Sequence, residues 1–332
     1  MTIETETDRP LGFGVVGGTS YVARKAVMPA IRTSPYARLV GASSRTPKSL
    51  QEDPLAPDER AYASLEEMLR DDDIEVIYVP LPNDLHLDVV RACLAAGRHV
   101  LCEKPIFLED SHFDLIAEEA ERAGKVVAEA FMTSYHPRMR LLVEQLRNGE
   151  WGTVYGISTS FTGTLSPLEG YRLSPERGGG VLWDVGCYGL HPIVEVLGSK
   201  PELIQATMTP VGPGGVDATV AAYLRYEHAD AFVRLSFLSG DSQSVSVWTH
   251  SHHLHFTHAS TPSPEESGFS ATGVDGSSRT VATAAADPYS EMIDEVAVAM
   301  RRGIQPSWNL ARSREMSRLI RQIRKSFRSS QE

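Results

Sequence analysis

A short segment in the second half of the chain carries three side chains that could handle protons. Residues 178–180 are all glycine, and the stretch from Val181 onward has the pattern of a helix. On a helix, Asp184, Tyr188 and His191 would share one face, because they follow the i, i+4, i+7 spacing. An acid, a phenol and an imidazole on one stripe suit proton transfer. The alternative is a helix buried against a sheet with its polar groups paired.

A second segment with chemical potential is Leu101–Pro105, which reads LCEKP. It follows a predicted parallel strand, and ligands of open α/β sheets bind at the carboxyl ends of such strands. Lys104 could donate a hydrogen bond to a substrate oxygen, and its charge would lower the pKa of a neighbouring acid. The alternative is a surface turn.

A glycine-rich turn near the N-terminus predicts a phosphate site. The formal G-x-G-x-x-G match runs from Gly12 to Gly17. Its first five residues are expected inside the first strand, whereas the fingerprint works only where a strand passes into a helix. We therefore expect the cofactor to bind the later residues Gly17, Gly18, Thr19, Ser20 and Tyr21.

The end of the second predicted strand indicates which dinucleotide binds. NAD-preferring sites place an acid there for the ribose 2′-hydroxyl. This chain has Ser44 and Arg45 instead, a hydrogen-bond donor and a permanent charge suited to phosphate. NADP(H) is the predicted cofactor, and a solvated basic turn is the alternative.

The elements that must position these residues alternate between strand and helix in the first half. This rhythm predicts right-handed crossovers and a parallel sheet covered by helices, a doubly wound Rossmann domain. The expected strands are 11–16, 38–42, 74–79, 99–101 and 126–130, and the expected helices are 21–33, 65–69, 84–97 and 110–123. Asp84 is the expected cap of the third helix.

After about residue 131 successive strands follow one another with little helix between them. Short connections favour antiparallel pairing, so the second domain is predicted to be α+β on a mainly antiparallel open sheet. The expected strands are 154–161, 203–208, 219–226, 232–237, 245–248 and 253–256, and the expected helices are 138–147, 289–302 and 310–327. Residues 260–278 are expected to form a polar loop.

The predicted organisation is a flexible tail at 1–9, a dinucleotide-binding domain at 10–131 and a substrate-binding and oligomerisation domain at 132–332. The sequence contains no run of eighteen apolar residues, so it predicts no membrane span. The net charge of −11 argues against nucleic acid and anionic lipid as partners. Cys93, Cys102 and Cys187 form no Cys-x-x-Cys pair, which favours reduced thiols in a cytoplasmic protein.

A histidine-rich stretch is the one candidate for a metal site. It contains His250, His252, His253, His255 and His258. On a strand, successive side chains point to opposite faces, so the set would be split. Nearby Cys or carboxylate ligands are lacking in the sequence, and we expect solvated or interface histidines and no metal.

Taken together, the motifs resemble the glucose-fructose oxidoreductase/inositol dehydrogenase (Gfo/Idh/MocA) family over nearly the whole chain. The matching segments are GVVGGTSYVARKAVMPAI near the N-terminus, VPLPNDLH at 79–86, CEKP at 102–105, AFMTSYHP at 130–137, YRLSPERGGGVLWDVGCY at 171–188 and DPYSEMIDEVAVAM at 287–300. CEKP and GGG-x-L-x-D-x-G-x-Y, in this order, are specific for the family.

The resemblance implies roles for single residues. Lys104, Asp184 and Tyr188 match the family's catalytic positions, with Tyr188 where other members have His. His191 and Arg172 are expected to contact the substrate. Further cofactor contacts are implied for Pro80, Leu81, Asn83, His86, Glu103 and Lys104.

Two departures from the family pattern put contacts in doubt. The glycine turn is one residue longer than the usual form, which affects the phosphate contacts. Thr133–Ser134 replaces an aromatic-Arg pair, which affects the substrate pocket.

The expected reaction is hydride transfer between the nicotinamide and a carbohydrate-like carbonyl or hydroxyl. Tyr188 would give the proton, Lys104 would favour its phenolate form, and Asp184 would orient both. The first expectation is an NADP-dependent reductase of a keto sugar, including a nucleotide-linked 3-keto-deoxysugar.

Three alternatives remain open. They are a dehydrogenase of a free aldose or cyclitol, a non-catalytic sugar- and dinucleotide-binding regulator, and a hydrolase that holds its nicotinamide tightly. The expected partners are a small sugar or nucleotide sugar and further copies of the chain, as a homodimer or homotetramer joined through the open sheet face.

Overall fold

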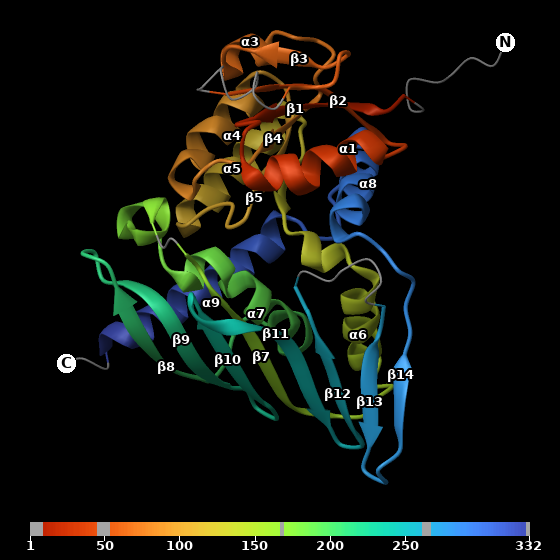
Figure 1. Ribbon diagram of the computed structural model, residues 1–332, viewed down its shortest axis with the longest axis vertical. Coiled ribbons are helices and arrows are strands. Elements are labelled where there is room, and N and C mark those ends of the chain that lie inside the picture. The colour runs from red at the N-terminus through yellow and green to blue at the C-terminus, as the bar shows by residue number, and fades with distance from the viewer. Residues whose placement is uncertain (1–8, 45–53, 167–168, 261–266, 330–332) are drawn as a thin grey trace, which may run out of the picture. The chain divides into compact units, whose positions relative to one another are not determined.

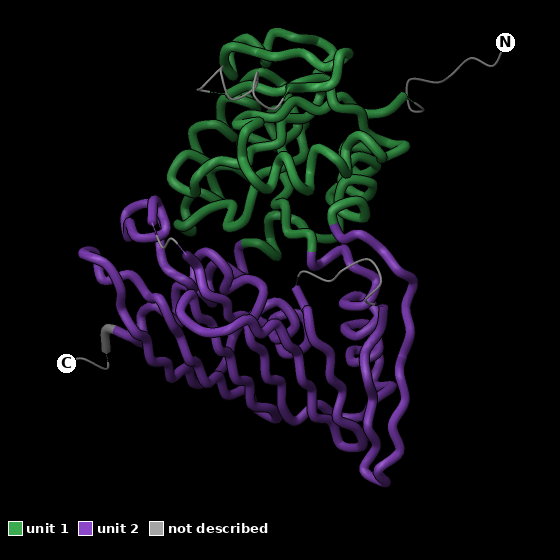
Figure 2. The backbone as a smooth tube through the Cα atoms, in the orientation of Figure 1, with its two compact units in different colours: residues 1–132, 289–313 green, residues 133–288, 314–332 purple. Residues whose placement is uncertain are grey.

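The computed structural model describes residues 9–44, 54–166, 169–260 and 267–329. The chain divides into two compact units, which Figure 2 distinguishes by colour. The first unit comprises residues 1–132 and 289–313, and the second comprises residues 133–288 and 314–332. The segment 289–313 was expected in the second domain, and its membership of the first unit corrects that boundary.

The first unit is built on a six-stranded parallel sheet with the order β3-β2-β1-β4-β5-β6. The chain starts in the middle, moves out to one edge and then returns to fill the other half. The strand order therefore reverses between β1 and β4, where α/β sheets of this kind bind ligands. The strands are β1 (Leu11–Val16), β2 (Ala37–Ser43), β3 (Arg60–Tyr62), β4 (Val76–Val79), β5 (His99–Glu103) and β6 (Val127–Ala130).

Helices follow the strands as the alternating pattern predicts. They are η1 (Ala23–Val27), a π-helical turn continuing into α1 (Met28–Thr33), then α3 (Leu65–Leu69), η2 (Asn83–Leu85), α4 (His86–Ala95) and α5 (Asp110–Ala123). Asp84 is not a cap, because it lies inside the 3₁₀ turn η2 and α4 begins only at His86.

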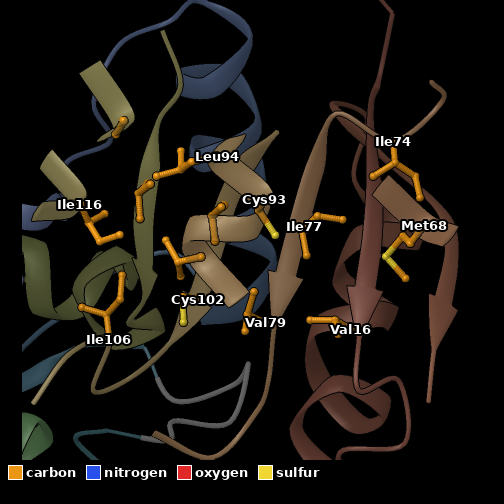
Figure 3. Close-up of a cluster of buried hydrophobic side chains, with 14 of the residues drawn as sticks. Val16, Met68, Ile74, Ile77, Val79, Cys93, Leu94, Cys102, Ile106 and Ile116 are labelled. Carbon is orange, nitrogen blue, oxygen red and sulfur yellow. The ribbon is translucent and has the colours of Figure 1, made fainter. Parts of the chain in front are cut away.

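One hydrophobic cluster of the first unit lies between the sheet and helices α4 and α5. Figure 3 shows Ile77 and Val79 of β4 and Cys102 of β5 beside Cys93 of α4 and Ile116 of α5. Burial raises the pKa of the Cys93 thiol to about 12, so this sulfur behaves as a small apolar group.

Helix α8 (Pro288–Arg301) joins the first unit through polar contacts that link distant parts of the chain. Arg301 Nη1 donates to Glu75 Oε1 at 2.7 Å, and Ser34 Oγ donates to Asp294 Oδ1 at 2.5 Å. Pro288 occupies the first helical position, one residue before the predicted start of this helix.

The second unit is built on an eight-stranded sheet with the order β14-β13-β12-β11-β7-β10-β9-β8. All neighbouring pairs are antiparallel except β7 and β10, which are parallel, so the prediction of a mainly antiparallel sheet is confirmed. The strands are β7 (Val154–Thr164), β8 (Leu203–Val211), β9 (Val216–Arg225), β10 (Asp230–Ser236), β11 (Leu238–Thr249), β12 (His252–Thr257), β13 (Phe269–Gly273) and β14 (Ser278–Val281).

Strand β13 corrects the prediction of a loop at 260–278. The stretch is polar, but Phe269 and Ala271 are buried, and β13 pairs with both β12 and β14. Pairing to an existing strand edge outweighs a weak intrinsic preference for strand. Residues 261–266 of the predicted loop lie outside the described residues.

Helix α7 (Val181–Leu197) packs on one face of this sheet against β7, β9 and β10, and α6 (Pro137–Arg147) packs beside it (Figure 1). Gly189 allows the close approach, because a side chain there would lie 3.0 Å from Leu235 and 3.2 Å from Val233 of β10. Further short turns are η3 (Met132–Tyr135), η4 (Gly170–Leu173) and η5 (Pro175–Arg177), and α9 (Leu310–Ser329) ends the described chain.

The described residues contain no helix long and apolar enough to cross a bilayer. The same residues contain no group of three or more His, Cys, Asp or Glu side chains able to hold a metal ion. His253 and His255 lie on one face of β12, and His252 lies on the other, beside Trp151.

Candidate active site

The glycine turn after β1 is fixed to the end of the neighbouring strand. The N–H groups of Gly17 and Gly18 both donate to the carbonyl of Ser43, at 3.0 and 2.8 Å. Gly17 has φ +82°, and a side chain there would lie 2.9 Å from Leu81 Cδ2. The positive φ favours glycine here, because other residues rarely adopt it. Residues 12–16 lie inside β1, which confirms that the formal motif starts too early.

The next residues of the turn approach the end of β2. The hydroxyl oxygens of Thr19 and Ser44 lie 3.4 Å apart, and Ser44 is buried. Ser20 N–H donates to Gly17, and the Tyr21 side chain is 80% exposed. Arg45, the predicted partner of a 2′-phosphate, lies outside the described residues.

Arg24 is a functional candidate that the sequence analysis did not single out. Its Nε donates to the carbonyl of Gly18 at 2.6 Å, which brings a guanidinium to the glycine turn. A basic residue one turn into the first helix is the signal that could have identified it.

The loop after β4 contributes Pro80, which is buried, and Leu81 and Asn83, which are partly buried. His86, expected beside the cofactor, is fully buried. Its Nε2 lies 2.8 Å from the carbonyl oxygen of Leu81, and its Nδ1 lies 3.1 Å from that of Pro105. Burial lowers the pKa of His86. The imidazole thus lies between the loop after β4 and the turn after β5, and in its neutral form it donates to only one of them.

Lys104 follows β5 beside an acidic side chain. Tyr78 donates its hydroxyl to Glu103 Oε1 at 2.6 Å. Burial raises the pKa of Glu103, and the positive charge of Lys104 acts in the opposite direction. Burial and the negative charge of Glu103 raise the pKa of Tyr78 well above its usual range, so Tyr78 acts as a hydrogen-bond donor.

A second carboxylate, Glu129 of β6, lies near the same turn and was not identified from the sequence. Its oxygens accept hydrogen bonds from Ile106 N–H, Trp308 Nε1–H and Ser313 Oγ–H, each at 2.8 Å. The side chain is buried, and its pKa is raised by burial and lowered by these donors and by Lys104, with a net rise.

In the second unit, the glycine run at 178–180 brings a preceding turn against the start of α7. A side chain at Gly179 would lie 2.7–2.8 Å from the carbonyl oxygens of Arg172, Tyr171 and Ser174. Gly180 has φ +105°, and a side chain there would collide with the carboxylate of Asp217. The run is therefore required for close backbone approach on two sides.

The predicted stripe on α7 is visible in the burial pattern. Every residue from Val181 to Glu195 is buried except Asp184 and Tyr188, which are partly exposed. These two side chains lie one helical turn apart on the same face. His191 lies on the same face but is only 2% exposed. Asp184 and Tyr188 are therefore the residues of this face that solvent reaches.

Arg172, expected to contact the substrate, forms an ion pair with Asp184. Its Nε donates to Asp184 Oδ2 at 2.8 Å, and its guanidinium lies over the ring of Tyr171, 4.9 Å from the centroid. The carboxylate raises the pKa of Arg172. The sequence placed both residues in the site and did not reveal that they pair.

The ring of Tyr188 stacks on Phe161 of β7, with centroids 4.9 Å apart and planes at 15°. Asp217 of β9 lies at the start of the same helix, where its Oδ2 accepts a hydrogen bond from Leu182 N–H at 2.7 Å. Neither Phe161 nor Asp217 was identified from the sequence, because each approaches α7 from a strand distant along the chain.

Each unit therefore gathers its own part of the predicted set. In the first unit, the residues follow the carboxyl ends of β1, β2, β4 and β5, which meet at one edge of the sheet. In the second unit, Arg172, Asp184 and Tyr188 gather at α7.

A doubly wound sheet with a glycine turn at its carboxyl edge defines a dinucleotide-binding fold. Residues 11–131 match the model of an oxidoreductase family with an NAD-binding Rossmann fold, and residues 139–260 match the GFO/IDH/MocA C-terminal domain. The chain belongs to the Gfo/Idh/MocA family of oxidoreductases.

Known proteins similar to this chain include D-xylose 1-dehydrogenase (NADP(+)) 2 of Haloferax volcanii. It is 31% identical over 317 residues, which cover 95% of this chain and 96% of that protein. A dTDP-3,4-didehydro-2,6-dideoxy-α-D-glucose 3-reductase of Streptomyces antibioticus is 34% identical over 57% of each chain. The crystal structure of a 3-ketoreductase from Actinomadura kijaniata, in complex with NADP and TDP-benzene, has the same fold. Its TM-score is 0.88 at 23% identity, over 96% of this chain and 98% of that one.

Proposed function

We propose that the protein reduces a keto sugar with NADPH, and that a nucleotide-linked 3-keto-deoxysugar is among its substrates. The observation that carries the proposal is the pair Asp184 and Tyr188, the two partly exposed residues in an otherwise buried stretch of α7. A carboxylate paired with Arg172 beside a phenol is a proton-handling arrangement.

The first unit has the features that a dinucleotide needs. The turn at Gly17 packs under Leu81 and is fixed to Ser43, so the start of the following helix is held at the carboxyl end of β1, where a pyrophosphate would bind. Because the N–H groups of Gly17 and Gly18 both donate to the carbonyl of Ser43, we assign the phosphate contacts to the residues from Thr19 onward. Ser44 and Arg45 would hold the 2′-phosphate of NADP(H).

When bound, the nicotinamide supplies the hydride, and the remaining chemistry belongs to side chains. Tyr188 gives its phenolic proton to the carbonyl oxygen, and Phe161 holds the ring by stacking. Lys104 donates a hydrogen bond to that oxygen and stabilises negative charge on it. Asp184 balances charge in the site, and Arg172 fixes its carboxylate.

The choice of substrate class draws on the reductases that resemble this chain. The relative from S. antibioticus is a 3-reductase of a dTDP-linked keto sugar. The ketoreductase of similar fold was crystallised with a TDP compound. These names support a nucleotide-linked sugar as the first class to be tested.

A second candidate is the NADP-linked oxidation of a free aldose or cyclitol. The match to the xylose dehydrogenase spans both chains almost completely and favours this reaction. The same side chains would then act in reverse, with Tyr188 accepting the proton of the substrate hydroxyl. The presence of Lys104, Asp184 and Tyr188 together argues against a regulator without catalysis.

The deciding experiment supplies NADPH with keto sugars and nucleotide-linked keto sugars, and NADP⁺ with free aldoses and cyclitols. The near-ultraviolet absorbance of the reduced nicotinamide follows each reaction. We expect turnover in the first set that is lost in Tyr188→Phe and retained in the control Tyr155→Phe, since Tyr155 is an exposed residue of β7. Turnover confined to the aldoses would favour the second candidate. Inactivity with every sugar would refute the proposal.

We also infer that copies of the chain associate through the sheet face that α7 leaves open. Phe232 is 49% exposed and Trp248 44% exposed on that face, and Tyr223 packs against Phe232. Exposed aromatic residues of this size favour a protein contact. Phe232→Glu should lower the molar mass measured by light scattering, and an unchanged mass would contradict this contact.

A further inference from the structure

We propose that Glu129 is a positioning residue for Lys104, and that its carboxylate both anchors the turn that carries the lysine and keeps a fixed negative charge beside the ammonium. The inference rests on the proposed function of Lys104. It adds a residue that the sequence motifs of the site do not contain.

The first observation is the way Glu129 is held. Its Oε1 accepts from Ile106 N–H, two residues after Lys104, and its Oε2 accepts from Trp308 and Ser313. A backbone N–H and an indole N–H can only donate, so two of the three partners require acceptor oxygens. This donor set fits an ionised carboxylate inside a buried site.

The second observation is that the turn is held from two sides. Glu129 binds the N–H of Ile106, and His86 contacts the carbonyl oxygens of Pro105 and Ile106. Glu129 bonds the segment directly after Lys104 to β6, and the ring of His86 in α4 lies against the carbonyl oxygens of the same segment. These contacts fix where the lysine leaves the sheet.

The third observation is electrostatic. The charge of Lys104 lowers the pKa of both Glu103 and Glu129. Coupling between two sites is reciprocal, so each carboxylate favours the protonated amine to the same extent. Glu103 is partly exposed, whereas Glu129 is buried, where the interaction with a charge is less screened.

Other titratable groups around this turn come from four elements. They are Tyr78 of β4, Cys102 and Glu103 of β5, His86 of α4 and Tyr289 of α8. Burial and Glu103 raise the pKa of Tyr78, and burial and neighbouring carboxylates raise that of Cys102, so both stay neutral near neutrality. Burial lowers the pKa of His86, which keeps it neutral as well. Among these groups, the two glutamates are the ones that interact with Lys104 as charges.

Trp308 provides a built-in reporter for the test, because its indole N–H donates directly to Glu129. In protein labelled with ¹⁵N at tryptophan, Trp308→Phe identifies the indole signal, and a pH titration of this signal follows the ionisation of Glu129. In Lys104→Met the midpoint should rise by about one pH unit, because the neighbouring positive charge is gone. The control Lys125→Met removes a lysine two residues before β6 and should leave the midpoint in place. An unchanged midpoint in Lys104→Met would overturn the proposal.

A second readout uses the pH profile of sugar reduction. Glu129→Gln should move the alkaline limb of kcat/KM down by about one pH unit, whereas Glu129→Asp keeps the charge and should leave the limb where it is. A residue with only a structural role would lower kcat in both variants without moving the limb, and that result would overturn the proposal. Should Glu129→Gln fail to fold, the Lys104→Met titration decides alone. That titration contains no substrate, so it stays valid if the proposed function fails.

Discussion

The guanidinium of Arg172 and the carboxylate of Asp184 form one unit, joined by a hydrogen bond of 2.8 Å from Nε to Oδ2. Arg172 lies in the 3₁₀ turn η4, and Asp184 lies in the first turn of α7. The glycine run between them brings the two segments together. The orientation of the Asp184 carboxylate therefore depends on Arg172, which lies in a turn before the glycine run 178–180.

Arg172→Gln should lower kcat/KM about tenfold, because Asp184 loses a charge-assisted hydrogen bond and its orientation. The pair is partly exposed, so solvent replaces some of the lost interaction. Steady-state kinetics check this prediction, with the exposed Arg122→Gln of α5 as the control. Equal activity in both variants would mean that Asp184 does not need its partner.

Tyr188→Phe should reduce turnover on the order of a hundredfold or more, since it removes the proposed proton donor. The phenyl ring keeps its stack on Phe161, so the fold and NADPH affinity should not change. Fluorescence titration of NADPH measures the affinity separately. If Tyr188 and Lys104 act on one step, Lys104→Ala combined with Tyr188→Phe should cost little more than the worse single change. If the losses of activity in the two single variants add fully in the double variant, Tyr188 and Lys104 act on separate steps.

Ser44→Asp should shift cofactor preference from NADPH toward NADH by about tenfold, because a carboxylate would repel a 2′-phosphate. Ser44 is buried against Thr19, so Thr19→Val serves as a control that disturbs the same contact without adding charge. The ratio of kcat/KM for the two cofactors is the measurement. An unaltered ratio would mean that Ser44 does not contact the 2′-phosphate.

Asp217→Ala should destabilise the second unit by about 1–2 kcal/mol, because α7 loses the carboxylate that accepts the N–H of Leu182. Asp217→Asn should cost less, since its amide oxygen can still accept that bond. Burial raises the pKa of Asp217, which also makes the neutral replacement less costly. Urea unfolding gives both values, with Asp275→Ala in the exposed turn between β13 and β14 as the control. A larger loss in Asp217→Asn than in Asp217→Ala would exclude the capping role.

Acid should weaken the fold through His99. Burial, with the charge of Lys125, lowers the pKa of His99 to about 4, against an ordinary value of 6.5. Its Nδ1 accepts the N–H of Val126 at 3.0 Å, which requires the neutral ring. The unfolded chain binds this proton first as the pH falls below 6.5, so stability falls with pH until the folded state also takes it up near 4.

The expected loss from His99 is about 2 kcal/mol of unfolding free energy at pH 5 relative to neutrality. His99→Asn keeps an acceptor for Val126 and removes the titrating group. Its unfolding free energy should therefore fall less between neutrality and pH 5 than that of the unchanged protein, by about 2 kcal/mol. Urea unfolding at both pH values provides the comparison. Parallel losses in the two proteins would assign the acid sensitivity to other groups.

Features that depend on the residue pattern of one contiguous segment could be predicted from the sequence. The alternation of strands and helices predicted the parallel strands β1 and β4, and the spacing of Asp184 and Tyr188 predicted their common face. Features that depend on contacts with a second, distant segment could not be predicted in this way. The contacts of Asp217 with α7 and of Trp308 with Glu129 join residues far apart in sequence, which local patterns do not report. Strand β13 was missed for the same reason, because neighbouring strands supply its partners.

The chain enters the first unit twice, and this limits how the protein could be divided or recombined. A fragment that stops at residue 132 would lack Trp308, Ser313 and Arg301. Two carboxylates would then lose hydrogen-bond donors, Glu129 inside the core and Glu75 at its edge. Exchange of dinucleotide-binding halves between relatives must therefore transfer the late segment 289–313 together with the early one.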